Sequence, residues 1–281
     1  MTAQLEDTQT AGGHTGVYVY GILPGDIEIE PGAPGVGDPP GEIRAIRYRD
    51  LAALVSDVDL DQPLGRAGDL FTHEELLDSS AASVAVLPLR FGAVLASDDA
   101  VAEELLGPHY DEFTAALRLL DGQAEYVVKG RYVERAVLGG VLTEDPEAAR
   151  LGDQIRGEDP DVTVEQRIRL GEIVAATIEA SRQADTRALS EAASEHVTAS
   201  VVRPPSHELD AVYAAFLVET GKAEGLRQAV ERLAEGWRDR IDLKLVGPLA
   251  AYDFVGNGGP TPKIRDEAGQ QAPRGREQDR Q

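Results

Sequence analysis

The sequence has no cysteine among its 281 residues. Disulfide bonds, thiolate nucleophiles and metal or iron–sulfur sites with cysteine ligands are therefore excluded. Residues 1–16 lack the basic start and apolar run of a signal peptide. No segment approaches the ~18 uninterrupted apolar residues that a transmembrane helix needs. We therefore expect a soluble protein in the cytoplasm, where the absence of disulfides is usual.

Aromatic residues and positive charges are also scarce. Aromatic residues make up 5% of the chain, so the core must consist mainly of Ala, Val, Leu and Ile. The 27 basic residues are outnumbered by 50 acidic residues, which gives a formal net charge of −23. A surface this acidic repels nucleic-acid phosphates and anionic membranes. We expect neither nucleic acid nor a membrane as a partner.

The length suggests one large domain or two ordinary ones. Composition marks residues 1–15 as a flexible leader and 256–281 as a disordered tail, because the tail has almost no apolar side chains. Between these ends, the pattern of elements restarts near residue 123. The sequence therefore predicts an N-terminal α+β domain over 16–122 and a C-terminal domain over 123–255.

In the N-terminal domain, apolar alternation predicts strands and a hairpin, and the helices follow acidic or capping residues. The strands are expected at 17–23, 43–48, 51–58 and within 84–95, and the helices at 71–83 and 98–120, with Ser97 as a cap. Pro88 and Gly92 interrupt the fourth strand region, and Gly107-Pro108 divides the second helix. This order gives a second α+β unit, which we assign to no named fold.

The C-terminal domain reads β-α-β-β-α-β. Strands are expected at 125–133, 196–203, 209–219 and 241–246, with a mostly helical region over 135–195 and a helix through Leu226, Val230, Leu233 and Trp237. This is the ferredoxin-like order with an enlarged first helical crossover. Gly247 and Pro248 should turn the chain out of the last strand, and the residues after them should fold back over the core.

The sequence contains no catalytic or cofactor-binding motif. None of the five histidines has the spacing of a metal motif, and the expected role of each is at the surface or at a helix end. The alternating Asp57, Asp59 and Asp61 lack the glycine and glutamate that an EF-hand loop requires. Phosphate-loop, dinucleotide and GxSxG patterns are absent. We therefore predict no catalytic residue, no metal and no cofactor.

Arg90 is the one polar residue that we select, because it interrupts the apolar run of residues 86–91. A buried, unpaired charge would be costly. The simpler interpretation pairs Arg90 with a carboxylate of a neighbouring helix. The functional interpretation makes it a partner-binding candidate.

Four segments, in order, are similar to motifs of one protein family. They are residues 17–22 (VYVYGI), 86–92 (VLPLRFG), 216–218 (FLV) and 245–255 (LVGPLAAYDFV). Over residues 16–255 the chain resembles the gas vesicle proteins F and L, more closely F. The resemblance implies two α+β domains, the second a modified ferredoxin-like one.

The resemblance also implies a function. Such proteins are non-catalytic assembly factors and minor vesicle components, which bind the apolar structural protein GvpA and restrain its aggregation during nucleation. The N-terminal domain would be the docking surface, and other gas vesicle accessory proteins would be further partners. The alternative is a ligand-binding or enzymatic ferredoxin-like protein, since this fold hosts many functions. That alternative requires a concave site with convergent carboxylates, or with His196 and His207 close together.

Overall fold

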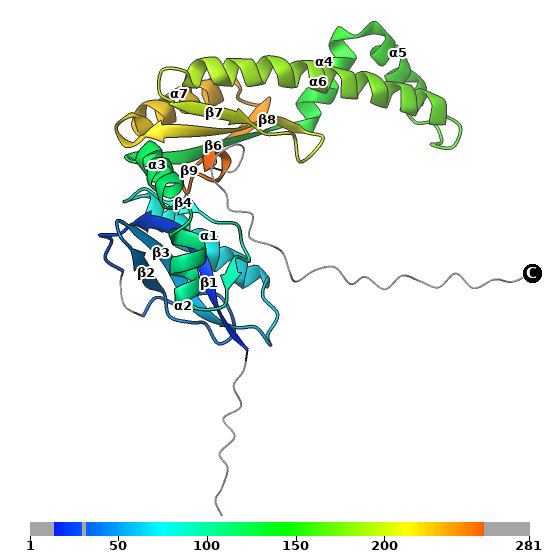
Figure 1. Cartoon of the computed structure of the whole chain (residues 1–281). Coiled ribbons are helices and arrows are strands. Elements are labelled where there is room, and N and C mark those ends of the chain that lie inside the picture. Colours follow the sequence, from blue (N-terminus) through cyan, green and yellow to red (C-terminus); the bar gives the residue numbers. More distant parts are fainter. Residues whose placement is uncertain (1–13, 30–31, 256–281) are drawn as a thin grey trace, which may run out of the picture.

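The computed structural model describes residues 14–29 and 32–255. The expected leader and tail lie almost wholly outside these ranges. The described chain is an α+β protein with two antiparallel sheets, one before and one after residues 121–122 (Figure 1). No described helix has the length and apolar character needed to cross a bilayer.

The first sheet has the strand order β2-β3-β1-β4, and β5 also pairs with β1. Its strands are β1 (Thr15–Pro24), β2 (Arg44–Tyr48), β3 (Leu51–Asp59), β4 (Leu87–Pro88) and β5 (Val94–Leu95). The predicted hairpin is present as β2 and β3. The expected strand region at 84–95 forms only these two short strands, since Pro88 cannot donate to a ladder and Gly92 has φ +93°.

Helices cover both faces of this sheet. They are α1 (Ala67–Ala81), α2 (Asp98–Ala100), the π-helical segment η1 (Val101–Leu106) and α3 (Tyr110–Leu120). Alternate residues of β1 enter two different cores: Val17 and Val19 pack with η1 and α3, while Tyr18 and Tyr20 pack with α1. Because both faces are covered, β1 reads as a continuous apolar run.

Two helix starts show how local chemistry sets the boundaries. Ser97 caps α2 as predicted, accepting a hydrogen bond from the Ala100 amide at 3.1 Å. The helix expected from residue 71 begins earlier, at Ala67. There the Asp69 carboxylate accepts hydrogen bonds from the amides of Gly65 and Arg66. Negative charge in a first helical turn is favourable.

The second sheet has the strand order β7-β8-β6-β9. Its elements are β6 (Gln123–Tyr132), α4 (Glu134–Glu144), α5 (Pro146–Ile155), α6 (Val164–Ala193), β7 (Ala199–Val202), β8 (Asp210–Glu219), the short 3-10 helix η2 (Thr220–Lys222), α7 (Ala223–Gly236) and β9 (Ile241–Leu249). Element order and strand order are those of a ferredoxin-like split βαβ unit. The crossover is enlarged as predicted, with an additional break at Asp145.

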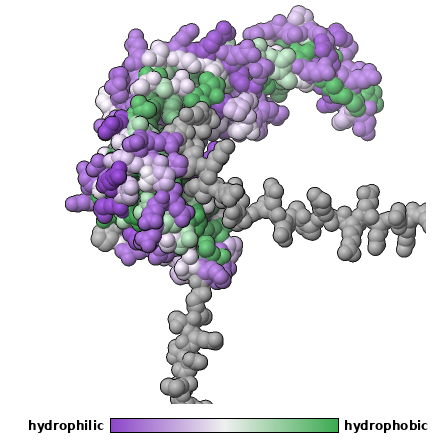
Figure 2. Space-filling model, viewed as in Figure 1, coloured by the Kyte–Doolittle hydropathy of each residue, from purple (hydrophilic) through white to green (hydrophobic). Residues whose placement is uncertain are grey.

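The enlarged crossover forms an arm. Helices α6 and α7 lie over one face of the sheet, while α4, α5 and the first turns of α6 extend beyond it (Figure 1). The surface in this view is mostly hydrophilic, with apolar residues near the end of the arm (Figure 2). Val162, Val164 and Ile168 are exposed there.

One expectation for the last strand is wrong. Gly247 and Pro248 do not end β9, which continues to Leu249 opposite Glu125 through a bulge. At Gly247, φ is +147°, and a Cβ would lie 2.5 Å from the Tyr126 ring. The glycine is therefore required by a close approach to the neighbouring strand.

The residues after β9 do fold back, but over the core of the first half. Ala250 and Tyr252 join the core on the α1 side, and Ala251, Phe254 and Val255 join the core on the α3 side. We call residues 250–255, which include the short helix α8 (Tyr252–Val255), the closing segment. Leu217 of β8 also packs into the α3-side core. The apolar core of the first half is therefore completed by the second.

We predict that the two halves unfold as one unit that depends on the closing segment. Deleting residues 250–281 should lower the free energy of unfolding by more than about 4 kcal/mol, because several buried side chains are lost together. Deleting only 256–281 should leave it within about 0.5 kcal/mol. Thermal and urea unfolding of both variants measure this, and equal stabilities would contradict it.

Candidate functional site

The opening, central and closing motifs meet in one buried cluster against α1. Tyr18 and Tyr20 of β1 lie with ring centroids 4.8 Å apart, and the His73 ring of α1 stacks on Tyr20 at 5.6 Å. Phe91 of the central motif lies 5.6 Å from His73, and Tyr252 of the closing segment lies 6.5 Å from it. These three motifs therefore pack together in one cluster.

Hydrogen bonds fix this aromatic cluster. The Gly92 amide donates to the Tyr18 hydroxyl at 3.2 Å, and the hydroxyl lies 2.9 Å from His73 Nδ1. On the other side of the ring, His73 Nε2 lies 3.2 Å from the Leu89 carbonyl oxygen. Because the carbonyl can only accept, Nε2 carries the proton and Nδ1 accepts from Tyr18. A neutral His73 thus holds both ends of the central turn.

The surface role expected for His73 is wrong. Its side chain is 1% exposed, and burial lowers its pKa from 6.5 to about 4. The sequence spacing indicates this burial, because Asp69, His73 and Leu77 lie at i, i+4 and i+8 on one buried helix face. Its buried setting makes His73 a structural residue of the cluster.

The other histidines are further from the core. His14 and His207 are exposed, and His109 precedes α3 and contacts Glu112 at 2.9 Å. His196 lies against Gly225 of α7, whereas His207 lines a groove beside α6. Within residues 14–29 and 32–255, no group of three or more acidic or histidine residues has the geometry of a metal site.

Arg90 is exposed. The ion pairs found among the described residues do not include it. The expectation that Arg90 pairs with a helix carboxylate is therefore not met. As a partner-binding residue it remains a prediction.

A buried ion cluster ties the closing segment to the second sheet. Glu125 of β6 accepts from the Asp253 amide at 3.0 Å and from Arg203 at 3.1 Å. Arg203 also bonds the Asp253 carboxylate at 2.7 Å and the Tyr213 hydroxyl at 2.7 Å. Burial raises the pKa of Glu125 to about 7, although the Asp253 amide and the Arg203 charge favour its ionised form. This cluster holds the closing segment in place.

The sequence analysis missed this cluster. A signal was present at Glu125, an acidic residue inside an apolar strand between Ala124 and Tyr126. Its partners Arg203 and Asp253 lie 78 and 128 residues away. Nothing in the local pattern connects residues so far apart.

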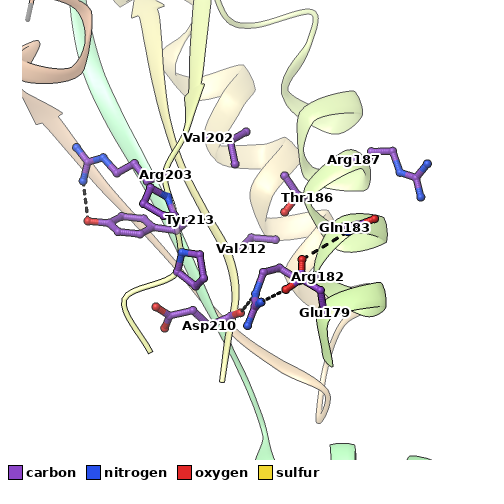
Figure 3. A pocket seen from close by; sticks show the side chains of 12 residues that line it. Glu179, Arg182, Gln183, Thr186, Arg187, Val202, Arg203, Asp210, Val212 and Tyr213 are labelled. Carbon is purple, nitrogen blue, oxygen red and sulfur yellow. Dashed lines mark hydrogen bonds and ion pairs between the residues drawn. The ribbon is translucent and has the colours of Figure 1, made fainter. Parts of the chain in front are cut away.

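A groove lies between α6 and the edge strand β7 (Figure 3). This groove has a volume of about 630 Å³. Its apolar wall consists of Val202, Pro204, Pro205 and Val212. Arg182 of α6 crosses it, donating to the carbonyl oxygens of Asp210 and Glu208 at 2.8 and 2.9 Å and to Glu179.

Two acidic side chains of the groove make structural contacts. Glu179 is paired with Arg182, and the Asp210 carboxylate accepts from the amides of Ser206 and His207 at 2.8 and 2.9 Å. Hydrogen bonds from Ser206 outweigh burial and lower the pKa of Asp210. An acid held ionised as a loop cap is poorly suited to proton transfer. The apolar wall of the groove can contact an apolar group.

Comparison with known proteins identifies the family of this chain. The family model described as gas vesicle synthesis protein GvpL/GvpF matches residues 16–256. The chain belongs to the GvpL/GvpF family. Gas vesicle protein F of Streptomyces sp. (strain CB03234) is 37% identical over 244 residues, covering 85% of this chain and 98% of that protein. Gas vesicle protein F of Dolichospermum flosaquae is 24% identical, covering 85% and 97%.

Two solved structures share the fold of this GvpL/GvpF protein. Gas vesicle protein GvpF from Anabaena sp. PCC7120 matches with a TM-score of 0.69 and 21% identity, covering 85% of this chain and 97% of that one. GvpF from Microcystis aeruginosa matches with a TM-score of 0.68 and 22% identity, covering 85% and 98%. The relatives named here are F proteins, which favours F over L, and their names describe gas vesicle proteins rather than enzymes.

We predict a pH dependence from His73. Unfolded His73 gains a proton near pH 6.5, whereas folded His73 resists protonation until about pH 4. The unfolded state thus binds more protons in this window, and stability falls as pH decreases, by about 3 kcal/mol in full. His73→Gln should remove this dependence. The difference between the free energies of unfolding of the wild type and of His73→Gln should therefore become smaller from pH 7 to pH 4.5. Glu125 titrates in both proteins, so its contribution cancels in this difference. Parallel curves would contradict it.

We predict that Arg90→Ala leaves the free energy of unfolding unchanged within about 0.5 kcal/mol, because the side chain is exposed. Arg203→Ala, the matched change in a buried cluster, should cost about 3 kcal/mol by leaving Glu125 and Asp253 without their cation. Urea unfolding compares the two. A large loss for Arg90→Ala would show a structural pairing.

Proposed function

We propose that this protein is a non-catalytic gas vesicle assembly factor. It binds the apolar structural protein GvpA in the cytoplasm, limits its aggregation while nucleation begins, and stays on the vesicle as a minor component. Membership of the GvpL/GvpF family over residues 16–256 carries this proposal.

The surface supports a role in holding an apolar partner. Large apolar side chains are exposed at separate places on an acidic protein of net charge −23. The exposed side chains can contact an apolar subunit, since such contacts drive most protein association. The net charge then opposes the approach of one complex to another. Binding and dispersal are thus properties of the same molecule.

Docking through the first half, residues 16–122, is part of the proposal. Arg90 and the exposed Leu60, Leu70 and Phe71 belong to that half. Because the closing segment completes its core, the docking surface requires the second half as well as the first. A fragment ending at 122 is an unsuitable probe.

The α6–β7 groove favours the alternative of a ligand-binding or enzymatic protein. A volume of about 630 Å³ falls in the range of small-molecule sites. However, Glu179 and Asp210 are engaged by Arg182 and by a loop. Neither His196 nor His207 is among the residues that line this groove. The groove therefore offers space for a ligand, but its engaged acidic groups give no support to an enzymatic function.

We predict that the full-length protein captures GvpA and reduces light scattering when GvpA is diluted from denaturant. Suppression should saturate near a fixed molar ratio, because it requires binding rather than turnover. The variant lacking residues 256–281 should act like the full chain. Absence of both capture and suppression would contradict the proposal, and loss of scattering at catalytic amounts would favour an enzyme.

A further inference from the structure

A second groove crosses the boundary between the two halves. Helix α1 of the first half contacts β9 of the second, and a groove with a volume of about 500 Å³ lies between them. Phe71 of α1 and Val246, Pro248 and Leu249 of β9 form its apolar part. We call this space the α1–β9 groove.

The apolar side chains of this groove are unusually exposed. Phe71 is 64% exposed and Val246 is 51% exposed. The chain has only five phenylalanines, and Phe71 is the one with a largely exposed side chain among the described residues. Scattered apolar residues are ordinary, but a pair that lines a common groove from a helix of one half and a strand of the other forms a contact surface.

The rim of the groove is acidic. Glu74, Glu75 and Asp78 follow Phe71 on α1 and line the groove. Asp78 accepts a hydrogen bond from the Ala250 amide at 2.8 Å and so helps to hold the closing segment. Glu74 and Glu75 are exposed. An apolar floor with two exposed carboxylates is complementary to apolar side chains flanked by positive charge.

The backbone of β9 determines the form of the occupant. A strand added to its edge would need a regular row of amide donors. Pro248 has no amide hydrogen, and the bulge at Gly247 disturbs the adjacent ladder. Side chains, and not the backbone, must therefore provide the contacts. That is the way in which an amphipathic helix binds a groove.

We propose that the α1–β9 groove docks an amphipathic helical segment of a partner, whose apolar face covers Phe71 and Val246 and whose basic residues face Glu74 and Glu75. This proposal deepens the proposed function and rests on it for the partner's identity. It also extends the docking surface across both halves.

The experiment uses the full chain and a designed amphipathic helical peptide of leucine and lysine, followed by fluorescence anisotropy. The peptide should bind, and binding should weaken as salt is raised from about 50 mM to about 500 mM. A leucine–glutamate peptide of the same length should not bind. Equal binding of both peptides would overturn the charge complementarity.

Matched substitutions locate the site. Phe71→Ser should reduce the affinity about 10-fold or more, and the double variant Glu74→Gln, Glu75→Gln about 5-fold. The controls are Leu119→Ser, at a leucine that is 72% exposed on α3, and the double variant Glu103→Gln, Glu104→Gln at exposed residues of η1. All four should keep the wild-type melting temperature. Equal losses in the control variants would overturn the assignment.

Two further outcomes separate this inference from the proposed function. Undiminished capture of GvpA by Phe71→Ser would overturn the groove as the docking site while leaving the assembly factor intact. Peptide binding that depends on Phe71, with no capture of GvpA by the wild type, would support the groove and contradict the proposed function. Concentration-dependent dimerisation abolished by Phe71→Ser, measured by sedimentation, would assign the groove to a second copy of this chain and overturn the proposal.

Discussion

The insertion of the closing segment into the first half is the interaction on which the rest of the structure depends. Tyr252 reaches the cluster of Tyr18, Tyr20 and His73, while Ala251 and Val255 fill the core against α3. Its backbone is held at both ends, by Asp78 from the first half and by Glu125 from the second. The orientation of the two sheets is therefore fixed by buried contacts and not by a linker.

This arrangement brings widely separated motifs of the chain together. The central motif turns at Gly92, whose amide donates to the Tyr18 hydroxyl of the opening motif, while His73 of α1 donates to the Leu89 carbonyl oxygen. The closing motif needs Gly247 so that β9 can pass Tyr126 before entering the first half. The opening, central and closing motifs are thus explained by their packing.

The sequence predicts much of the fold, because local patterns are strong here. The β2–β3 hairpin, the Ser97 cap and the ferredoxin-like order of the second half follow from periodicity and turn residues. The errors concern contacts between distant segments. Burial of His73 depends on Tyr18, and the start of α1 depends on Asp69, which also accepts from the Gly37 amide 32 residues away. The α1–β9 groove combines residues about 170 positions apart, which no local pattern can join.

The proposed activity follows from combining an acidic surface with a few exposed apolar residues. Phe71 and Val246 supply contact area, and Glu74 and Glu75 select a basic segment over an acidic one. The closing segment brings the two sides of the groove together, since β9 leads directly into it. Structural integrity and partner binding therefore depend on the same region of the chain.

Hydrogen exchange of the full-length protein, alone and saturated with GvpA, tests the central claim most directly. Bound partner should slow exchange of backbone amides on the exposed face of α1 around residues 71–79 and at residues 244–247 of β9, with little change along α6 and β7. Protection confined to the α6–β7 groove, or no change in any segment at saturating GvpA, would contradict the account.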